Sequence, residues 1–304
     1  MLTYRDAEKE LTEILRERVP ENVEESLTTM SEALVRTTLE TKPERIAIGS
    51  WARLNAALGG GLREREFTIL CGPTGAGKTT LLANIAAQLV ANLTPVFIAS
   101  VEVGIEDFVR KMVSVVTGES LAYGSDLKTV VAKMGKPFIT KNTVFTNYES
   151  RVKHRQILCD MLYAHRVKGT KVAVIDNLNF MMEVTKAQDQ IIAMDTAVHE
   201  FVVFCKKVPI HVIMVMHPRK VEAGSGRIES ENDIKGSSTA VQESSNVILY
   251  NRLADMSDAP LGVSPGLCRE LKFAKVRRNG RAVGSKIILQ LVGESEAYRE
   301  CRTM

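Results

Sequence analysis

The chain has 304 residues, of which 45% are hydrophobic and 25% charged, and its mean hydropathy is -0.03, a balance that excludes a wholly disordered or collagen-like protein. No apolar run approaches the roughly 18 residues of a membrane span, the charged N-terminus is not a signal peptide, and five scattered cysteines without a CxxC pair indicate neither disulfides nor zinc. The net charge of +4 is uneven, because residues 1–48 hold 11 acidic and 7 basic residues and leave the rest of the chain distinctly basic, which suits a phosphate-rich partner.

The first predicted unit is a helical N-terminal segment over residues 1–45. Two apolar stripes, separated by Pro20, follow the spacing of helix faces. They consist of Leu11, Ile14, Leu15 and Val19, and of Val23, Leu27, Met30 and Leu34. Each stripe needs a surface to pack on, and the sequence leaves open whether this is the chain's own body or a neighbouring subunit. A charge-rich stretch ends the segment, and a second domain is predicted over residues 46–304.

Short β-branched runs alternate with longer helical patterns from residue 67 onward. Such alternation predicts βαβ units, and therefore an α/β fold with a mostly parallel central sheet covered by helices. Strands are expected at residues 67–72, 95–100, 171–177, 210–217 and 246–252, and helices at residues 79–92, 105–118, 155–169 and 188–208.

The C-terminal part predicts an antiparallel extension of this sheet. Residues 267–277 and 284–291 flank Asn279 and Gly280, a pair typical of a tight hairpin turn. Basic residues gather here against Glu270 alone, namely Arg269, Lys272, Lys275, Arg277, Arg278, Arg281 and Lys286. The loops at 218–238 and 254–266 are long for a compact domain, which indicates a functional or mobile role.

Residues 72–79 carry the most specific motif. They match G-x-x-x-x-G-K-[ST] and lie between a predicted strand and a predicted helix. Backbone N–H groups of such a loop wrap phosphates, Lys78 reaches the β- and γ-phosphates, and the Thr79 hydroxyl holds Mg²⁺. We therefore predict a site for ATP or another nucleoside triphosphate. Its binding residues are Gly72, Pro73, Thr74, Gly75, Ala76, Gly77, Lys78, Thr79 and Thr80.

Three polar side chains follow predicted strands at the sheet edge where ligands of open α/β sheets bind. Asp176 ends one strand, and we expect it to bind Mg²⁺ together with Thr79. Glu102 follows another strand, and we expect it to be the general base that activates the attacking water. His217 ends a third strand. It is either a satisfied surface histidine or a group that contacts the γ-phosphate, and we favour the second.

Basic residues lie beyond His217 and near the predicted hairpin tip. Those in the loop after His217 are placed so that loss of the γ-phosphate can change how this loop binds a second polyanion. This loop contains Arg219, Lys220, Arg227, Lys235 and Gly236. Near the hairpin tip, Arg277 is either a plain exposed arginine or a finger that serves the nucleotide of a neighbouring subunit, which requires an oligomer.

Taken in order, these motifs resemble the superfamily-4 ring helicases of the DnaB type, and within them Twinkle and the helicase half of bacteriophage helicase-primases. The resemblance covers residues 48–291 and implies a RecA-like P-loop core. It makes Glu102 the catalytic base, Asp176 the Walker B acid and His217 the γ-phosphate histidine. The motifs that carry it are GPTGAGKT, Glu102, VIDNLNFMM, VMHPRK, DIKGSSTAVQESSNVILYNR and KVRRNG.

The resemblance also implies roles that the spacing leaves open. Arg277 falls on the arginine-finger position, with Lys275 two residues earlier. Gln242 matches a glutamine in the helix after the DNA-contacting loop, and Arg252 matches an arginine near the nucleotide base. The loop from Arg219 to Gly236 corresponds to the DNA loop of the central channel.

The expected function is that of an ATP-dependent, replicative-type DNA helicase, a hexameric ring that moves 5′ to 3′ on single-stranded DNA. Two rivals remain: a RecA-type recombination or repair ATPase, and a nucleotide-gated ring assembly factor that unwinds nothing. Only residues 1–45 precede the motor, so we expect no primase or collar domain here and a separate primase, polymerase or loader as partner. The acidic start does not resemble a mitochondrial transit peptide, and we expect the cytosol of a bacterium or a phage-infected cell.

Overall fold

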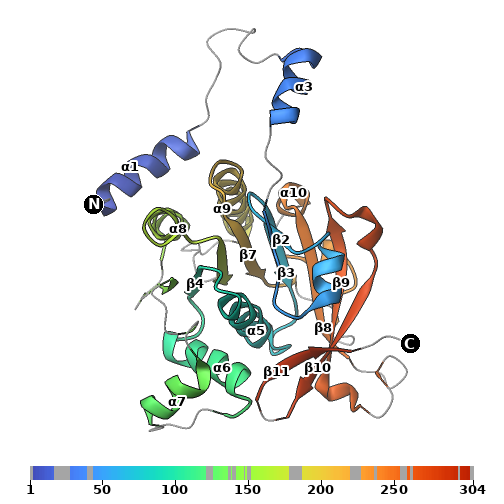
Figure 1. Cartoon of the computed structure of the whole chain (residues 1–304). Coiled ribbons are helices and arrows are strands. Elements are labelled where there is room, and N and C mark those ends of the chain that lie inside the picture. Colours follow the sequence, from blue (N-terminus) through green and yellow to red (C-terminus); the bar gives the residue numbers. More distant parts are fainter. Residues whose placement is uncertain are drawn as a thin grey trace.

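The structure, a computed structural model of the chain, has an α/β fold built around one large sheet (Figure 1). A small ribbon of two short strands lies beside that sheet. The residues that the structure describes are 3–16, 28–39, 44–120, 126–135, 138, 142–146, 148, 152–177, 187–219, 227–235, 238–253, 259–260, 263–293 and 295–301.

Among these residues, nine strands form the large sheet in the order β11-β10-β9-β8-β3-β7-β6-β4-β5. Neighbours from β8 to β5 run parallel, whereas β8, β9, β10 and β11 pair antiparallel. The prediction of a mostly parallel sheet with an antiparallel C-terminal extension is therefore confirmed. The strands are β3 Phe67–Cys71, β4 Val96–Ser100, β5 Thr143–Phe145, β6 Val172–Asp176, β7 His211–Met216, β8 Asn246–Arg252, β9 Cys268–Val276, β10 Lys286–Val292 and β11 Ala297–Glu300.

Helices cover both faces of the sheet, which explains why every residue of β3, β6 and β7 is buried rather than every second one (Figure 1). One face carries α5 (Lys78–Ala91) and α6 (Ile105–Thr117), with α7 (Leu127–Met134) against α6. The other face carries α8 (His154–Lys168) and α9 (Ala187–Lys207), and α10 (Ser238–Glu243) packs on α9. No helix in the described part of the chain combines the length and the apolarity needed to cross a membrane.

A short ribbon and one helix lie near the start of the body, on the same side of the sheet as α5. Strand β1 (Arg45–Ile46) pairs with β2 (Leu62–Arg63), and α4 (Ala52–Ala57) lies between them in the chain. The buried side chains of Trp51 and Leu54 join the apolar cluster under α5. The division of the chain at residue 46 stays a prediction.

The first N-terminal helix, α1 (Tyr4–Leu15), packs on the chain's own body. Thr3 and Asp6 form a capping box that starts it, because each side chain accepts a hydrogen bond from the other residue's backbone N–H. Ala7 and Leu11 are buried in the cluster formed with α8 and α9, and Glu10 forms an ion pair with Arg166 of α8. The first apolar stripe therefore has an intramolecular surface.

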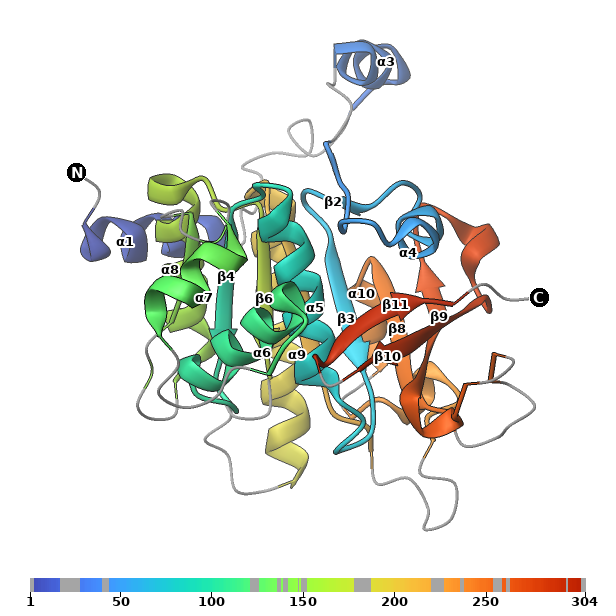
Figure 2. The same cartoon turned by 60° about the horizontal axis from the view of Figure 1, so that its bottom comes forward.

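The second N-terminal helix, α3 (Met30–Leu39), buries no residue. Its apolar side chains are open to solvent, with Met30 82% and Leu39 77% exposed, and both views show the helix standing away from the sheet (Figures 1 and 2). Part of the predicted stripes, namely Val19, Val23 and Leu27, lies outside the described residues. For α3 the alternative of a surface on another subunit therefore stays open.

The predicted hairpin pairs as expected, but its tight Asn-Gly turn is wrong. Strands β9 and β10 pair from Lys272 and Lys286 onward, and residues 277–285 connect them through a 3₁₀ turn at Gly280–Ala282. Asn279 has a φ of -142°, whereas a type I′ turn needs a positive φ at that position. Its side-chain amide instead donates to the carbonyls of Ala56 (3.1 Å) and Ala57 (3.0 Å) at the end of α4.

Candidate active site

The P-loop joins β3 to α5, as the motif predicts. A Cβ on Gly72 would lie 2.6 Å from the carbonyl oxygen of Tyr250 in β8, so only glycine fits there. Gly77 has a φ of 98° and begins α5 without any side-chain cap. The first N–H groups of α5 therefore have no capping side chain and face the loop, which is the arrangement that binds anions.

Lys78 folds onto its own loop. Its Nζ donates to the carbonyls of Gly72 and Pro73, each at 2.9 Å, and its side chain is buried. Burial lowers the pKa of Lys78, while the nearby carboxyls of Asp176 and Glu102 act in the opposite direction. The ammonium is thus held over the loop that the sequence assigns to phosphate.

Thr79 and Asp176 meet at the base of the same site. The Thr79 hydroxyl donates to Asp176 Oδ2 at 2.6 Å, while Oδ1 of the same carboxyl is buried and has no hydrogen-bond partner. Burial raises the pKa of Asp176 to about 6, and the bond from Thr79 opposes that shift. A hydroxyl and an unsatisfied carboxylate oxygen side by side fit a hard cation such as Mg²⁺, which usually takes one or two carboxylates and phosphate oxygens.

The ends of three strands bring Glu102, Asn177 and His217 together. Glu102 follows β4, and its backbone N–H donates to the Asp176 carbonyl at 3.2 Å. Its Oε2 lies 3.8 Å from Nε2 of His217, which follows β7. Burial and the Lys78 ammonium lower the pKa of His217, while Glu102 acts to raise it. The predicted base and the predicted phosphate sensor thus share one corner of the site.

Asn177 is a member of this corner that the sequence reasoning missed. It is fully buried directly after Asp176, and its Nδ2 donates to Glu102 Oε2 and lies 2.9 Å from His217 Nε2. Its signal in the sequence was its place directly after Asp176, as the last residue of the strand predicted over residues 171–177.

Two arginines from the antiparallel side hold the outer carbonyls of the P-loop. Arg252 Nη2 donates to the Gly75 carbonyl, and the buried Arg269 donates from Nε to the Ala76 carbonyl at 2.9 Å. The sequence placed Arg252 near the nucleotide base and Arg269 only in a basic cluster, so the role of Arg269 was missed. Its place on a strand opposite the loop gave no local signal. Within the motif, Thr74 and Gly75 are exposed, whereas Thr80 is buried at the start of α5.

Lys275 and Arg277 lie beside Gln242, which belongs to α10. The side-chain hydrogen bonds of these two cations go to carbonyls of α10 and not to the P-loop. Lys275 Nζ donates to the carbonyls of Val241 (2.8 Å) and Gln242 (2.7 Å), and Arg277 Nη2 donates to the Gln242 carbonyl at 3.0 Å. Both cations therefore sit at the negative end of α10. The Gln242 side chain is exposed.

The predicted DNA loop is anchored at His217. The backbone N–H of Lys235 donates to the His217 carbonyl at 2.9 Å, Arg219 donates to the Asp233 carbonyl at 2.6 Å, and Pro218 forms a β-bridge with Ile234. The two ends of this loop are therefore paired with each other directly beside His217. Two predicted contacts, Lys220 and Gly236, lie outside the described residues.

Arg227 has a place in the fold that the sequence did not indicate. Its Nη2 lies 2.6 Å from Oε1 of Glu270, whose side chain is only 1% exposed, and its Nε lies 2.9 Å from Glu229. Lys286 binds the other oxygen of Glu270 at 2.9 Å. In this structure Arg227 neutralises a buried carboxylate, and its role as a DNA contact stays a prediction.

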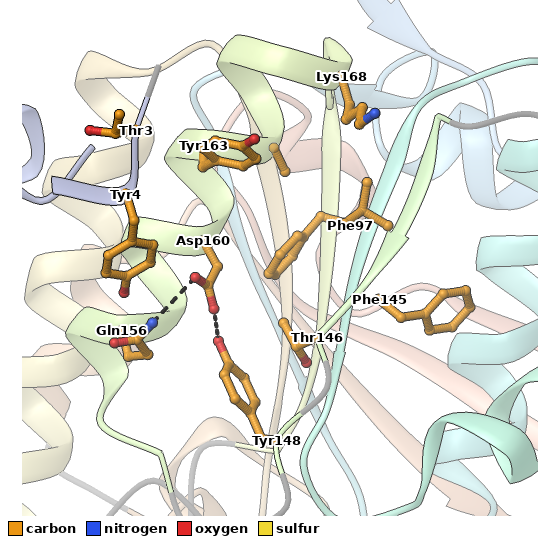
Figure 3. Close-up of a pocket in the computed structure, with 12 residues that line it drawn as sticks. Thr3, Tyr4, Phe97, Phe145, Thr146, Tyr148, Gln156, Asp160, Tyr163 and Lys168 are labelled. Carbon is orange, nitrogen blue, oxygen red and sulfur yellow. Dashed lines mark hydrogen bonds between the residues drawn. The ribbon is translucent and has the colours of Figure 1, made fainter. Parts of the chain in front are cut away.

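A large cavity lies elsewhere, between α1, β5 and α8 (Figure 3). It has a volume of about 700 Å³, and aromatic side chains such as Phe97 and Tyr163 form its walls. The Asp160 carboxyl accepts hydrogen bonds there from the Tyr148 hydroxyl and from the Gln156 amide (Figure 3). Its lining, as the structure describes it, includes none of the predicted site residues. The candidate site is therefore defined by the P-loop and the strand ends.

The sequence matches the family described as the DnaB-like helicase C terminal domain over residues 49–294. The chain belongs to the DnaB-like helicase family. Two solved structures share its fold. One is an ATPase domain, with a TM-score of 0.70 and 13% identity, covering 93% of this chain and 100% of that one. The other is a DnaB-like replicative helicase described with its interactions with primase, with a TM-score of 0.71 and 14% identity, covering 97% of this chain and 71% of that one.

Membership of the DnaB-like family confirms the resemblance predicted from the motifs. It makes the chain a P-loop enzyme that hydrolyses nucleotide as the motor of a replicative-type helicase. A recombination or repair ATPase is not favoured. The matched range contains the P-loop, all three strand ends and both arginines that hold the loop.

Proposed function

We propose that this chain forms a ring, a hexamer, that hydrolyses ATP between subunits and moves 5′ to 3′ on single-stranded DNA, excluding the other strand. The observation that carries the proposal is the cluster above the P-loop, where Lys78, Asp176 and Glu102 converge beside a histidine that anchors the basic loop. Such a cluster supplies phosphate binding, a place for a cation and a base in one corner.

The chemistry follows from the positions of these groups. Backbone N–H groups of the P-loop and Lys78 bind the phosphates of ATP or another NTP, and Thr79 and Asp176 would hold Mg²⁺. Mg²⁺, when bound, neutralises charge on the β- and γ-phosphates. Glu102 accepts a proton from water as the water oxygen bonds to the γ-phosphorus and the bond to the bridging oxygen breaks, which leaves ADP and inorganic phosphate.

Arg277 and Lys275 complete the site of the next subunit in this proposal. Their side chains lie at the C-terminal end of α10, and their hydrogen bonds go to carbonyls of that helix. A guanidinium provided by a neighbour stabilises the charge that develops on the γ-phosphoryl group. The Gln242 carbonyl accepts from both cations, and Arg252 donates to the Gly75 carbonyl at the edge of the P-loop.

Subunit contact requires an unused surface, and α3 has one. Its residues Met30, Leu34, Val35 and Leu39 are all more than half exposed. Helix surfaces of this kind pack against another protein. We place them on the neighbouring subunit of the ring.

DNA binding is assigned to the loop whose stem is bound to His217. Arg219 and Lys235 lie on that stem, and Lys220 and Gly236 belong to the same loop in sequence. Contacts to phosphates rather than bases suit a motor that ignores sequence. We expect a separate primase, polymerase or loader as partner, and the cytosol of a bacterium or phage-infected cell as the place of action.

A strand-displacement assay tests this function. The purified chain with Mg²⁺ and ATP should unwind a forked duplex that has a free 5′ arm, and Glu102→Gln should bind the same fork without unwinding it. Mass photometry on the same samples should show a ring that depends on nucleotide. DNA-stimulated hydrolysis without unwinding would instead indicate an assembly or loading factor, and full-rate hydrolysis by a lone protomer would contradict the shared site.

A further inference from the structure

Asn177 lies between the two groups on which the chemistry depends. It follows β6 and is fully buried, whereas Glu102 comes from the end of β4 and His217 from the end of β7. The strand order β7-β6-β4 puts β6 in the middle, so a short side chain at its end can reach both neighbours.

The hydrogen bonds fix the orientation of the Asn177 amide. Nδ2 has two hydrogens. One is donated to Glu102 Oε2, and the other points to His217 Nε2 at 2.9 Å. A flipped amide would turn its oxygen toward a carboxylate, which only accepts when ionised. His217 Nε2 is therefore an acceptor here, with the ring proton on Nδ1.

The same donor count limits what His217 can do at one time. A γ-phosphate oxygen is an acceptor, so a histidine nitrogen that binds it must donate. Nε2 cannot accept from Asn177 and donate to phosphate in the same state. Contact between this nitrogen and the γ-phosphate therefore breaks its bond to Asn177, while the bond from Asn177 to Glu102 needs no such change.

We propose that Asn177 is a positioning residue that holds the carboxylate of Glu102 and links it to the state of His217. The inference rests on the proposed function, in which Glu102 is the base and His217 contacts the γ-phosphate. Asn177 touches neither water nor nucleotide in this account, and it acts by fixing where the carboxylate lies. Loss of the amide should therefore reduce turnover without weakening nucleotide binding.

Two substitutions separate this role from simple packing. Asn177→Asp keeps the shape but cannot donate when ionised, and Asn177→Ala removes the group. Misplacing a catalytic group by about 1 Å costs up to roughly 100-fold, so we expect kcat to fall about 10- to 100-fold in both variants. The KM for ATP and the Kd for a fluorescent ATP analogue should stay within about threefold, because the P-loop contacts are unchanged.

The control is Asn251→Ala. Asn251 is equally buried, but its amide bonds the backbone of Ile228, where it accepts at 2.9 Å and donates at 2.8 Å. Its loss should lower the thermal midpoint, while kcat measured without DNA, per folded and nucleotide-binding protomer, stays near wild type, because Ile228 belongs to the loop assigned to DNA and not to the nucleotide site. If the Asn177 variants behave like this control, with kcat per binding site within twofold of wild type, Asn177 is only structural and the inference is wrong. Should the aspartate variant not fold, the alanine variant decides alone.

A double variant shows whether Asn177 acts through the base. Glu102→Gln with Asn177→Ala should be no slower than Glu102→Gln alone, since the group being positioned has already lost its function. A further tenfold loss in the double variant would contradict the inference. If Glu102→Gln itself keeps wild-type turnover, the assignment of the base fails and this inference fails with it. If only the Asn177 variants keep turnover, the proposed function stands without it.

Discussion

Substituting Arg227 decides between two uses of the loop after His217. The sequence predicts a DNA contact, whereas the structure places the guanidinium 2.6 Å from Glu270, with only 20% of the Arg227 side chain exposed and 1% of the Glu270 side chain. Lys286, 2.9 Å from the other carboxylate oxygen, is the second cation at this site. Arg227→Ala therefore leaves a buried carboxylate with one cation instead of two.

The size of the effect follows from that burial. Removing one partner of a buried ion pair typically costs about 3–5 kcal/mol, and because Lys286 remains we expect a loss of about 2–4 kcal/mol. In a domain of this size each kcal/mol shifts Tm by roughly 2–4 °C, so Tm should fall by roughly 5–15 °C.

Thermal unfolding by circular dichroism measures this loss. The control is Arg299→Ala, because Arg299 of β11 is exposed, donates to Gln290 of β10 at 2.8 Å, and should change Tm little. The double variant Arg227→Ala with Glu270→Gln should be less destabilised than the two single variants predict together, since a neutral amide needs no cation.

Binding of single-stranded DNA completes the test. If Arg227 is structural, the salt dependence of binding by the folded variant should keep the wild-type slope. If instead Tm stays within about 1 °C of wild type while the salt slope falls by nearly one phosphate contact, the structural reading of Arg227 is refuted and the sequence prediction is right.

Three further predictions address stability, assembly and turnover. Burial lowers the pKa of His211 to about 4, so as pH falls from about 6.5 to 4 only the unfolded chain gains this proton, and the free energy of unfolding should drop by roughly 3 kcal/mol over that window. In urea unfolding at a series of pH values, His211→Gln should make the free energy of unfolding depend less on pH between about 6.5 and 4. An unchanged pH dependence would exclude His211 as the cause. Leu34→Glu on α3 should prevent ring formation in mass photometry and leave Tm unchanged, because Leu34 is exposed in the protomer. Leu11→Ala at the buried α1–α8 contact should instead lower the free energy of unfolding by about 2–4 kcal/mol. Rings of normal size from Leu34→Glu would show that α3 is not part of the subunit interface. Arg277→Ala should bind a fluorescent ATP analogue within about threefold of wild type and lose at least about 10³-fold in turnover, and normal turnover would show that Arg277 is not a finger.

The parts of the site that the sequence predicted are those set by local pattern. Continuous apolar runs marked the parallel strands, and polar residues at their carboxyl ends, such as Asp176 and His217, had to meet because the carboxyl ends of parallel strands share one edge. The P-loop was visible because its glycines and Lys78 follow a fixed spacing.

The parts that the sequence did not predict depend on contacts between distant segments. Asn177 and Glu102 are 75 residues apart, and Arg269 and Ala76 are 193 apart, so no spacing rule links them. The turn at Asn279 was wrong for the same reason, because hydrogen bonds to the end of α4, far away in the chain, decide its conformation. Only the packed fold shows these three interactions.

Strand β9 joins two places that act in different sites of the proposed ring. Arg269, near its start, holds the P-loop of its own subunit, and Arg277, directly after its end, is the cation offered to the adjacent one. Eight residues of strand span about 26 Å, and a paired strand hardly changes its length. Each protomer would thus contain a stiff strut between consecutive nucleotides, so that a shift of one phosphate loop displaces the arginine serving the next.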